Sequence, residues 1–237
     1  MTKDMIKNAK NSPQVEALFK AGAHFGYTKT RRHPSTGAFI LTSKNKADII
    51  NLEKTDESLE KAKAIVKTLA QEGKKILFVG TKPEAKKIVI ETAESLDMPY
   101  VSERWVGGII TNFPEIKKRI TKLIEWRENK AKGGLEKYTK KERLLIDKEA
   151  ERLQKYFSGI VSLTKAPDLL FVVDSSKEHI AVNEAQKSKV PVMSISNTDS
   201  DIRGLEYPII GNDAATSSIA FFMEEIAKAF RAGRLEN

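Results

Sequence analysis

The sequence contains no cysteine and only three histidines. Without thiols the chain has neither disulfides nor thiolate metal ligands, and His24, His33 and His179 are not set at the spacing of a zinc site. No apolar run approaches the ~18 residues of a membrane-spanning helix. The polar start lacks the apolar core of a signal peptide. These absences predict a soluble protein with no metal, no cofactor and no membrane partner.

A phosphate-binding loop is also missing. Residues 78–82, Phe-Val-Gly-Thr-Lys, have one glycine where a dinucleotide fingerprint needs three, and they lack the Walker pattern. Asp174 follows an apolar stretch and is best explained as a cap or turn acid, the alternative being a catalytic acid or metal ligand. Loop and cap roles, with an Mg²⁺ site as the alternative, are expected for Asn197, Asp199, Asp201 and Asp213. We therefore predict no catalytic residue and no enzyme.

Positive charge is concentrated in two parts of the chain, which has a net charge of +9 and a pI of about 9.5. Residues 1–46 hold 9 Lys/Arg against 2 Asp/Glu, a net charge of +7, and residues 113–156 hold 14 against 8, a net charge of +6. Residues 47–112 and 157–237 are mildly acidic. Two basic segments on a near-neutral body favour nucleic acid as the partner, over a membrane surface or an acidic protein.

Short apolar stretches alternate with helical patterns along most of the chain. Residues 75–80, 169–174 and 190–196 are typical of parallel strands that are covered on both faces. Residues 83–96 and 213–232 have the periodicity of helices. This alternation predicts an α/β protein with a three-layer, mostly parallel sheet.

The N-terminal part is less regular. Residues 27–37 show no apolar period and are predicted to form a loop, followed by short strands at about 38–41 and 47–51. Thr55, with two acidic residues directly after it, is predicted to cap the next helix.

The central basic segment predicts an inserted antiparallel helical hairpin over residues 113–157. Its apolar residues step by three and four, the seam spacing of a coiled coil, at Phe113, Ile116, Ile120 and Leu123 and again at Ile146, Ala150, Leu153 and Phe157. Gly133 and Gly134 lie between the two helices. Thr139 and Glu142 have the spacing of a capping box for the second helix.

Residues 104–113, Arg-Trp-Val-Gly-Gly-Ile-Ile-Thr-Asn-Phe, stand out from this regular pattern. The glycine pair permits backbone with φ > 0, and a cation beside an indole suits a phosphate and a base. Thr111 and Asn112 can also cap the helix that follows. With the basic segments, this stretch gives the candidate RNA-binding residues Lys29, Arg31, Arg32, His33, Lys44, Lys46, Arg104, Trp105, Thr111, Asn112, Lys117, Lys118, Arg119 and Lys122.

The same stretch resembles the Arg-Trp-Leu-Gly-Gly-x-Leu-Thr-Asn-Phe signature of the bacterial small-subunit ribosomal protein family S-two. Further motifs resemble that family in the same order and spacing, and the resemblance covers about residues 12–232. These motifs are Ala-Gly-Ala-His-Phe-Gly at 21–26, Ile-Ile-Asn-Leu-Glu-Lys-Thr at 49–55, and the stretches 76–82, 167–174 and 207–213.

The resemblance implies a non-catalytic component of the small ribosomal subunit. It implies a flavodoxin-like sheet with an inserted hairpin, and contacts with small-subunit rRNA at the head–body junction rather than with DNA. Partners would include other small-subunit proteins, among them the large mRNA-binding protein S-one. The location would be the cytoplasm, or an organellar ribosome. The expected division is an N-terminal helix and arm (1–37), an α/β body (38–112 and 158–237) and the hairpin (113–157).

Three positions depart from the family pattern. Tyr27 stands where His is usual, His33 lies in an arm motif that lacks its Trp, and Asn197 replaces an Asp. A stacking contact in the arm is therefore taken over by His33 or lost.

Overall fold

The computed structural model describes residues 13–132 and 139–236, which form two sheets. The larger is a five-stranded parallel sheet with the order β5-β4-β6-β7-β8. Its strands are β4 (Ile76–Val79), β5 (Tyr100–Val101), β6 (Leu169–Val173), β7 (Val192–Ser196) and β8 (Tyr207–Ile210). The α/β class and the parallel sheet predicted from the sequence are confirmed.

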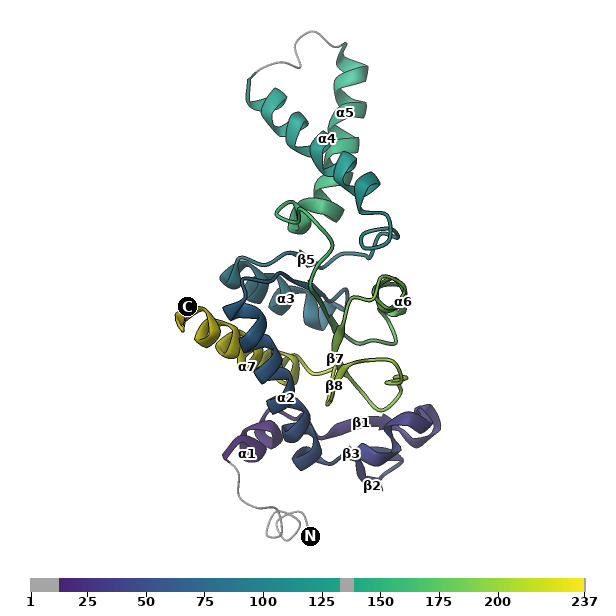
Figure 1. Ribbon diagram of the computed structural model, residues 1–237. Helices are drawn as coiled ribbons and strands as arrows, with labels where there is room; N and C mark the ends of the chain where they lie inside the picture. Colours follow the sequence, from purple (N-terminus) through teal and green to yellow (C-terminus); the bar gives the residue numbers. More distant parts are fainter. Residues whose placement is uncertain (1–12, 133–138, 237) are drawn as a thin grey trace.

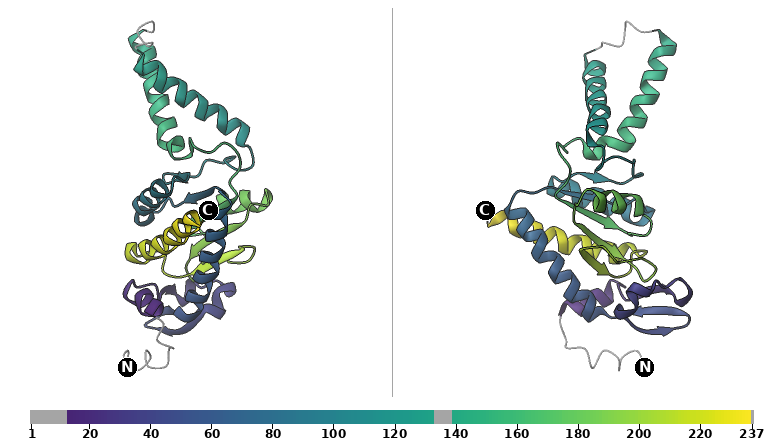
Figure 2. Two further views of the ribbon diagram at one scale, coloured as in Figure 1. Left: turned by 60° about the vertical axis from the view of Figure 1, so that its left-hand side comes forward. Right: turned by 45° about the vertical axis from the view of Figure 1, so that its right-hand side comes forward.

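The parallel strands are apolar throughout because both faces of the sheet are covered. In β4, Ile76 and Phe78 pack into one core cluster, while Leu77 and Val79 pack into another. The first cluster lies under α2 (Leu52–Gln71), α3 (Pro83–Leu96) and α7 (Thr216–Leu235), and the second lies under α6 (His179–Lys187) (Figure 2). The second core also receives the base of the hairpin, which is how the body holds that insertion.

The smaller sheet is antiparallel, with the order β1-β3-β2. It consists of β1 (Phe25–Thr28), β2 (Ile40–Lys44) and β3 (Ala47–Ile50), preceded by α1 (Pro13–Lys20). The predicted loop at 27–37 was wrong in part, because β1 reaches Thr28 and is followed by the short 3₁₀ helices η2 (Lys29–Arg31) and η3 (Pro34–Phe39). β1 forms by pairing with β3, some twenty residues on, and no periodicity within the loop signals that pairing.

The start of α2 also differs from the prediction. Asn51 caps this helix, its side chain accepting a hydrogen bond from the Glu53 amide at 3.0 Å. Thr55 lies inside the helix and is buried, and its hydroxyl donates to the Ile210 carbonyl at 2.6 Å. Thr55 therefore joins α2 to β8 instead of capping the helix.

The central segment forms two helices, α4 (Phe113–Ala131) and α5 (Lys140–Phe157), followed by the turn η4 (Ser158–Ile160). The α4 seam residues predicted from the sequence are buried, and so are Ala150 and Phe157 on α5. Thr139 and Glu142 form the predicted capping box. The predicted glycine turn at 133–134 lies outside the described residues.

The two basic segments lie at opposite ends of the molecule. In Figure 1 the hairpin projects from the top of the α/β body, whereas the antiparallel sheet lies at the bottom, and the views in Figure 2 agree. Of the helices that the structure describes, not one combines the length and the apolar character needed to cross a bilayer.

Candidate nucleic-acid interface

Three exposed lysines meet at the tip of the antiparallel sheet. Lys44 pairs with Ala47 across the β2–β3 turn, whose two central residues, Asn45 and Lys46, have φ of 50° and 66°. The Lys29 amide donates to the Lys46 carbonyl at 3.0 Å, which brings the end of β1 to the same place. Because positive φ at both positions is the pattern of a type I′ hairpin turn that favours Asn-Gly, Lys46 occupies a position where Gly is less strained.

The adjacent arginines have different environments. Arg31 is exposed, and its guanidinium lies 5.4 Å from the centre of the Tyr27 ring. Arg32 instead binds Asp48 in a bidentate pair, with Nε to Oδ2 at 2.8 Å and Nη2 to Oδ1 at 2.5 Å. The Asp48 side chain is fully buried, and the hydrogen bonds from Arg32 hold its pKa below the ordinary value. The charge of Arg32 is thus matched within the protein by Asp48, and its expected phosphate contact stays a prediction.

The arm is fixed to the loop after β7 by a set of contacts centred on Thr198. The Tyr27 amide donates to the Thr198 hydroxyl at 3.0 Å, and the His33 amide donates to its carbonyl at 2.8 Å. Gly26 passes so close that an added Cβ would lie 2.8 Å from the Thr198 methyl. The His33 ring accepts from the Ser35 amide and is half-buried. These contacts hold the exposed arm cations on a fixed backbone, and they give His33 a role within the protein.

The turn at residues 104–112, which contains Trp105 and the glycine pair, is organised by Glu184 on α6. The sequence did not lead us to this residue. Its Oε1 accepts from the Trp105 indole at 3.0 Å and the Gly108 amide at 2.8 Å. Its Oε2 accepts from the Ile110 and Thr111 amides at 3.2 and 3.3 Å and from the Thr111 hydroxyl at 3.1 Å. Burial alone would raise the pKa of Glu184, but these hydrogen bonds lower it below the ordinary value.

Trp105 belongs to the core. Its side chain is 6% exposed and packs in the second core cluster. The ring therefore packs within the protein, and its expected contact with an RNA base stays a prediction. The Thr111 hydroxyl serves Glu184, and Asn112 occupies the N-cap position of α4 without a capping hydrogen bond from its side chain. Arg104 and Asn112 are exposed and remain candidate RNA-binding residues of this turn.

Four exposed cations follow on the first turns of α4. Lys117 and Arg119 have no acidic partner among the described residues, whereas Lys118 pairs with Glu115 at 2.5 Å and Lys122 pairs with Glu149 at 2.8 Å. Exposed ion pairs of this kind contribute about 0–1 kcal/mol, so a phosphate can replace the carboxylates at little cost. Lys117, Lys118 and Lys122 also lie together on one exposed side of α4.

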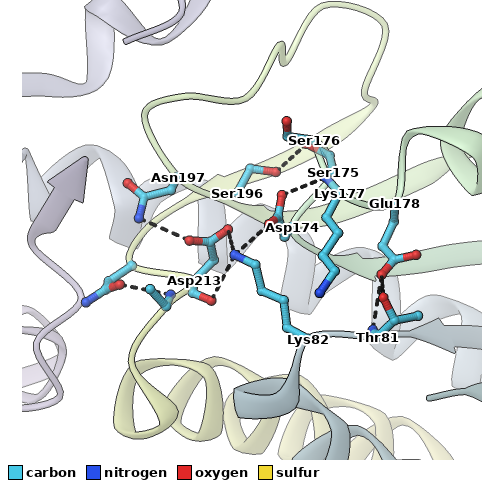
Figure 3. A network of polar contacts seen from close by, with 12 residues as sticks. Thr81, Lys82, Asp174, Ser175, Ser176, Lys177, Glu178, Ser196, Asn197 and Asp213 are labelled. Carbon is cyan, nitrogen blue, oxygen red and sulfur yellow. Dashed lines mark hydrogen bonds and ion pairs between the residues drawn. The ribbon is translucent and has the colours of Figure 1, made fainter. Parts of the chain in front are cut away.

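The carboxyl ends of the parallel strands, where α/β folds often bind ligands, carry a network of internal contacts (Figure 3). The Lys82 ammonium lies 2.5 Å from Asp174 and 2.9 Å from Asp213, and Asn197 donates to Asp213 at 3.1 Å. Burial alone would lower the pKa of Lys82, but the two carboxylates raise it above its ordinary value. A cation from the chain itself thus occupies this edge.

Two more contacts bear on the rejected nucleotide and metal sites. The Thr81 amide, which follows β4, donates to Glu178 at 3.1 Å, so this N–H is already bonded. Asp174 accepts from the Lys177 amide at 3.0 Å, the turn role expected for it. Within the described ranges, no group of three or more His, Cys, Asp or Glu residues is arranged to hold a metal ion.

Comparison with known proteins gives the family. The model of the family described as "Ribosomal protein S2" matches residues 18–233. The chain belongs to the ribosomal protein S2 family. It is 42% identical to "Small ribosomal subunit protein uS2" of Helicobacter hepaticus over 94% of this chain and 84% of that protein. The protein of the same name from Thermus thermophilus is 44% identical over 88% of this chain and 82% of its own length.

Membership in the S2 family confirms the resemblance seen in the sequence. The chain is a structural component of the small ribosomal subunit and takes part in translation as part of a ribonucleoprotein; it is not an enzyme. Lys82, Asp174 and Asp213 accordingly have a structural role and do not form a catalytic centre.

Proposed function

We propose that the chain holds small-subunit rRNA through two cationic surfaces. The arm surface consists of Lys29, Arg31, Lys44 and Lys46, and the hairpin surface consists of Lys117, Lys118, Arg119 and Lys122, with Arg104 and Asn112 beside it. The observation that carries the proposal is that the four cations of each surface are exposed and lie in the two segments, 1–46 and 113–156, that supply the whole positive excess of the chain.

Both surfaces suit a folded RNA. Lysine and arginine contacts to phosphates position a protein without reading sequence, and structured RNA is recognised largely by shape and backbone. The arm surface stands on backbone tied to Thr198, and the hairpin surface begins one turn after the loop held by Glu184. This ordering before binding lowers the entropic cost of forming the contacts.

Finer features implied by the family resemblance are also proposed. If the five parallel strands are numbered 1 to 5 along the chain, their order in the sheet is 2-1-3-4-5. This order supports a flavodoxin-like sheet. Contact between α4 and α5 supports a coiled-coil hairpin over 113–157 as a unit apart from the body at 38–112 and 158–237. The N-terminal unit, expected to end at residue 37, extends to Ile50 if strand pairing sets its limit.

We further propose the cytoplasmic ribosome as the location, with an organellar ribosome as the alternative. Neighbouring small-subunit proteins, including protein S-one, are the proposed protein partners. Co-sedimentation of the chain with small subunits in a sucrose gradient tests this placement, and recovery only in the free fractions would favour an RNA-binding protein outside the ribosome.

The salt dependence of rRNA binding tests the two surfaces. An arm variant, Lys29→Ala/Arg31→Ala/Lys46→Ala, and a hairpin variant, Lys117→Ala/Lys118→Ala/Arg119→Ala, should each flatten the plot of log affinity against log salt. Three lost phosphate contacts change the slope by roughly 2–3. The matched control, Lys61→Ala/Lys177→Ala/Lys187→Ala, removes three exposed body cations and should leave the slope unchanged. An unchanged slope in either test variant rules out that surface.

A further inference from the structure

We propose that Glu184 is the positioning residue that sets the direction of the hairpin relative to the α/β body. This inference rests on the proposed function, since the hairpin presents one of the two cationic surfaces. Glu184 touches none of the proposed RNA-contacting cations, and it would act only through the loop at residues 104–112.

Glu184 links the α/β body to the hairpin. It lies on α6, whose Ala181 and Ala185 pack in the second core under the parallel sheet. Its five donors all come from Trp105–Thr111, the loop that leaves β5 and enters α4 at Phe113. One carboxylate thus connects a helix of the body to the segment from which the hairpin departs.

The loop needs such an anchor because its backbone is unusual. Gly108 has φ of +96°, and the loop forms no strand or long helix whose own hydrogen bonds would fix its course. The amides of Gly108, Ile110 and Thr111 find their acceptor in Glu184. Buried amides must be paired, and the Ile110 amide is buried, so the carboxylate stabilises this course of the loop.

The other end of the hairpin is held differently. After α5 the chain passes Gly159, where an added Cβ would lie 2.4 Å from the Tyr100 carbonyl on β5. Close packing thus fixes where α5 rejoins the body. With one helix fixed there, the course of the loop at residues 104–112 sets how α4 enters its packing in the second core, and hence where Lys117 and Arg119 point.

Glutamine cannot replace this carboxylate. Each Glu184 oxygen accepts at least two hydrogen bonds. In either orientation of a glutamine amide at this position, its NH₂ group faces backbone or indole N–H donors and leaves them unpaired. Glu184→Gln is therefore a nearly isosteric variant that should loosen the loop without removing a packed side chain.

The matched control is Glu178→Gln. Glu178 is also buried and also accepts from a backbone amide and a hydroxyl, but its donors belong to Thr81, away from the loop. Both Thr81 donors reach Oε1 of Glu178, so a glutamine there keeps the two hydrogen bonds. Glu178→Gln thus shows the effect of removing a buried carboxylate charge alone, whereas the loss of the hydrogen bonds that hold the loop affects only Glu184→Gln.

The readout is a distance between spin labels in the free protein. Because the chain has no cysteine, Lys61→Cys on α2 and Glu151→Cys on α5 give a single labelled pair at exposed positions. We expect a narrow distance distribution for the parent and for Glu178→Gln, and a broadened or shifted one for Glu184→Gln. Equal distributions in all three proteins, or equal broadening in both glutamine variants, would overturn the inference.

A second variant covers the case in which Glu184→Gln does not fold. Thr111→Val removes only the hydroxyl donor of Glu184 at an exposed position and should broaden the same distribution to a smaller extent, whereas an unchanged distribution would refute the inference. The distances are measured without RNA, so they stand apart from the proposed function. If Glu184→Gln broadens the distances while the hairpin alanine variant leaves the salt slope unchanged, the positioning role holds and the RNA contact fails.

Discussion

Replacing Trp105 separates a core role from an RNA-stacking role. The side chain is 6% exposed, packs in the second core cluster and donates to Glu184 at 3.0 Å. Trp105→Ala removes the ring and the hydrogen bond, and Trp105→Phe removes mainly the hydrogen bond. The two variants therefore form a graded series.

The structure sets the size of each effect. Removing a large buried aromatic side chain costs about 3–5 kcal/mol of unfolding free energy. A hydrogen bond to a charged group contributes about 1.5–3 kcal/mol, which is the loss expected for Trp105→Phe. The unfolding free energy of a typical domain is about 5–15 kcal/mol in total. The Phe variant should therefore remain folded, and the Ala variant should retain little of its stability.

Urea unfolding of the free protein measures these losses. The chain has two tryptophans, so a Trp126→Phe background isolates the Trp105 fluorescence, which should be blue-shifted and protected from acrylamide. The rRNA affinity of folded Trp105→Phe should equal that of the parent. If Trp105→Ala instead keeps its full stability and weakens RNA binding by about 1–3 kcal/mol, the ring stacks on RNA and its assignment to the core is refuted.

Two further predictions concern the glycine pair and the buried lysine. Gly108→Val forces a branched side chain onto backbone with φ of +96° and should cost about 1–3 kcal/mol in urea unfolding. At Gly107 an added Cβ meets nothing closer than 3.8 Å, so Gly107→Ala should cost less, and equal losses would refute the strain argument. Lys82→Met leaves Asp174 and Asp213 without their cation and should cost about 3–5 kcal/mol near pH 7. Because the pKa of Lys82 is raised above 10.5, its contribution is complete below pH 10.5 and is lost only as the pH rises through the folded value, so a difference between parent and variant that vanished by about pH 9 would contradict this account.

Local patterns predicted many of the individual strands and helices well. The apolar strands, the helix from Pro83 to Leu96 and the capping box at Thr139 appear where the sequence placed them. Each depends on neighbours within a few residues, which periodicity and capping rules capture. The antiparallel pairing of β1 with β3 and the link from Thr55 to Ile210 depend on distant segments, so local reasoning missed them.

The candidate site was predicted in part for the same reason. Within a basic run, Arg32 looks like its neighbour Arg31, and only the fold places buried Asp48 against one of them. The sequence does carry a signal for Glu184, because this acid falls between Val182 and Ala185 on the buried side of α6. An acid on an apolar helix face predicts hydrogen-bond donors packed against it, and Trp105, Gly108, Ile110 and Thr111 supply them.

The separation of the antiparallel sheet and the hairpin has a consequence for how tightly the chain is retained (Figure 1). With the proposed contacts at both ends, binding of one end keeps the other near its own site at a high effective concentration. The protein dissociates only if both surfaces are unbound at the same time, so two contacts of modest affinity give slow dissociation from the RNA. The body also sets the distance between the two surfaces. Only an RNA fold whose phosphates lie at that distance binds both surfaces at once and gains this avidity.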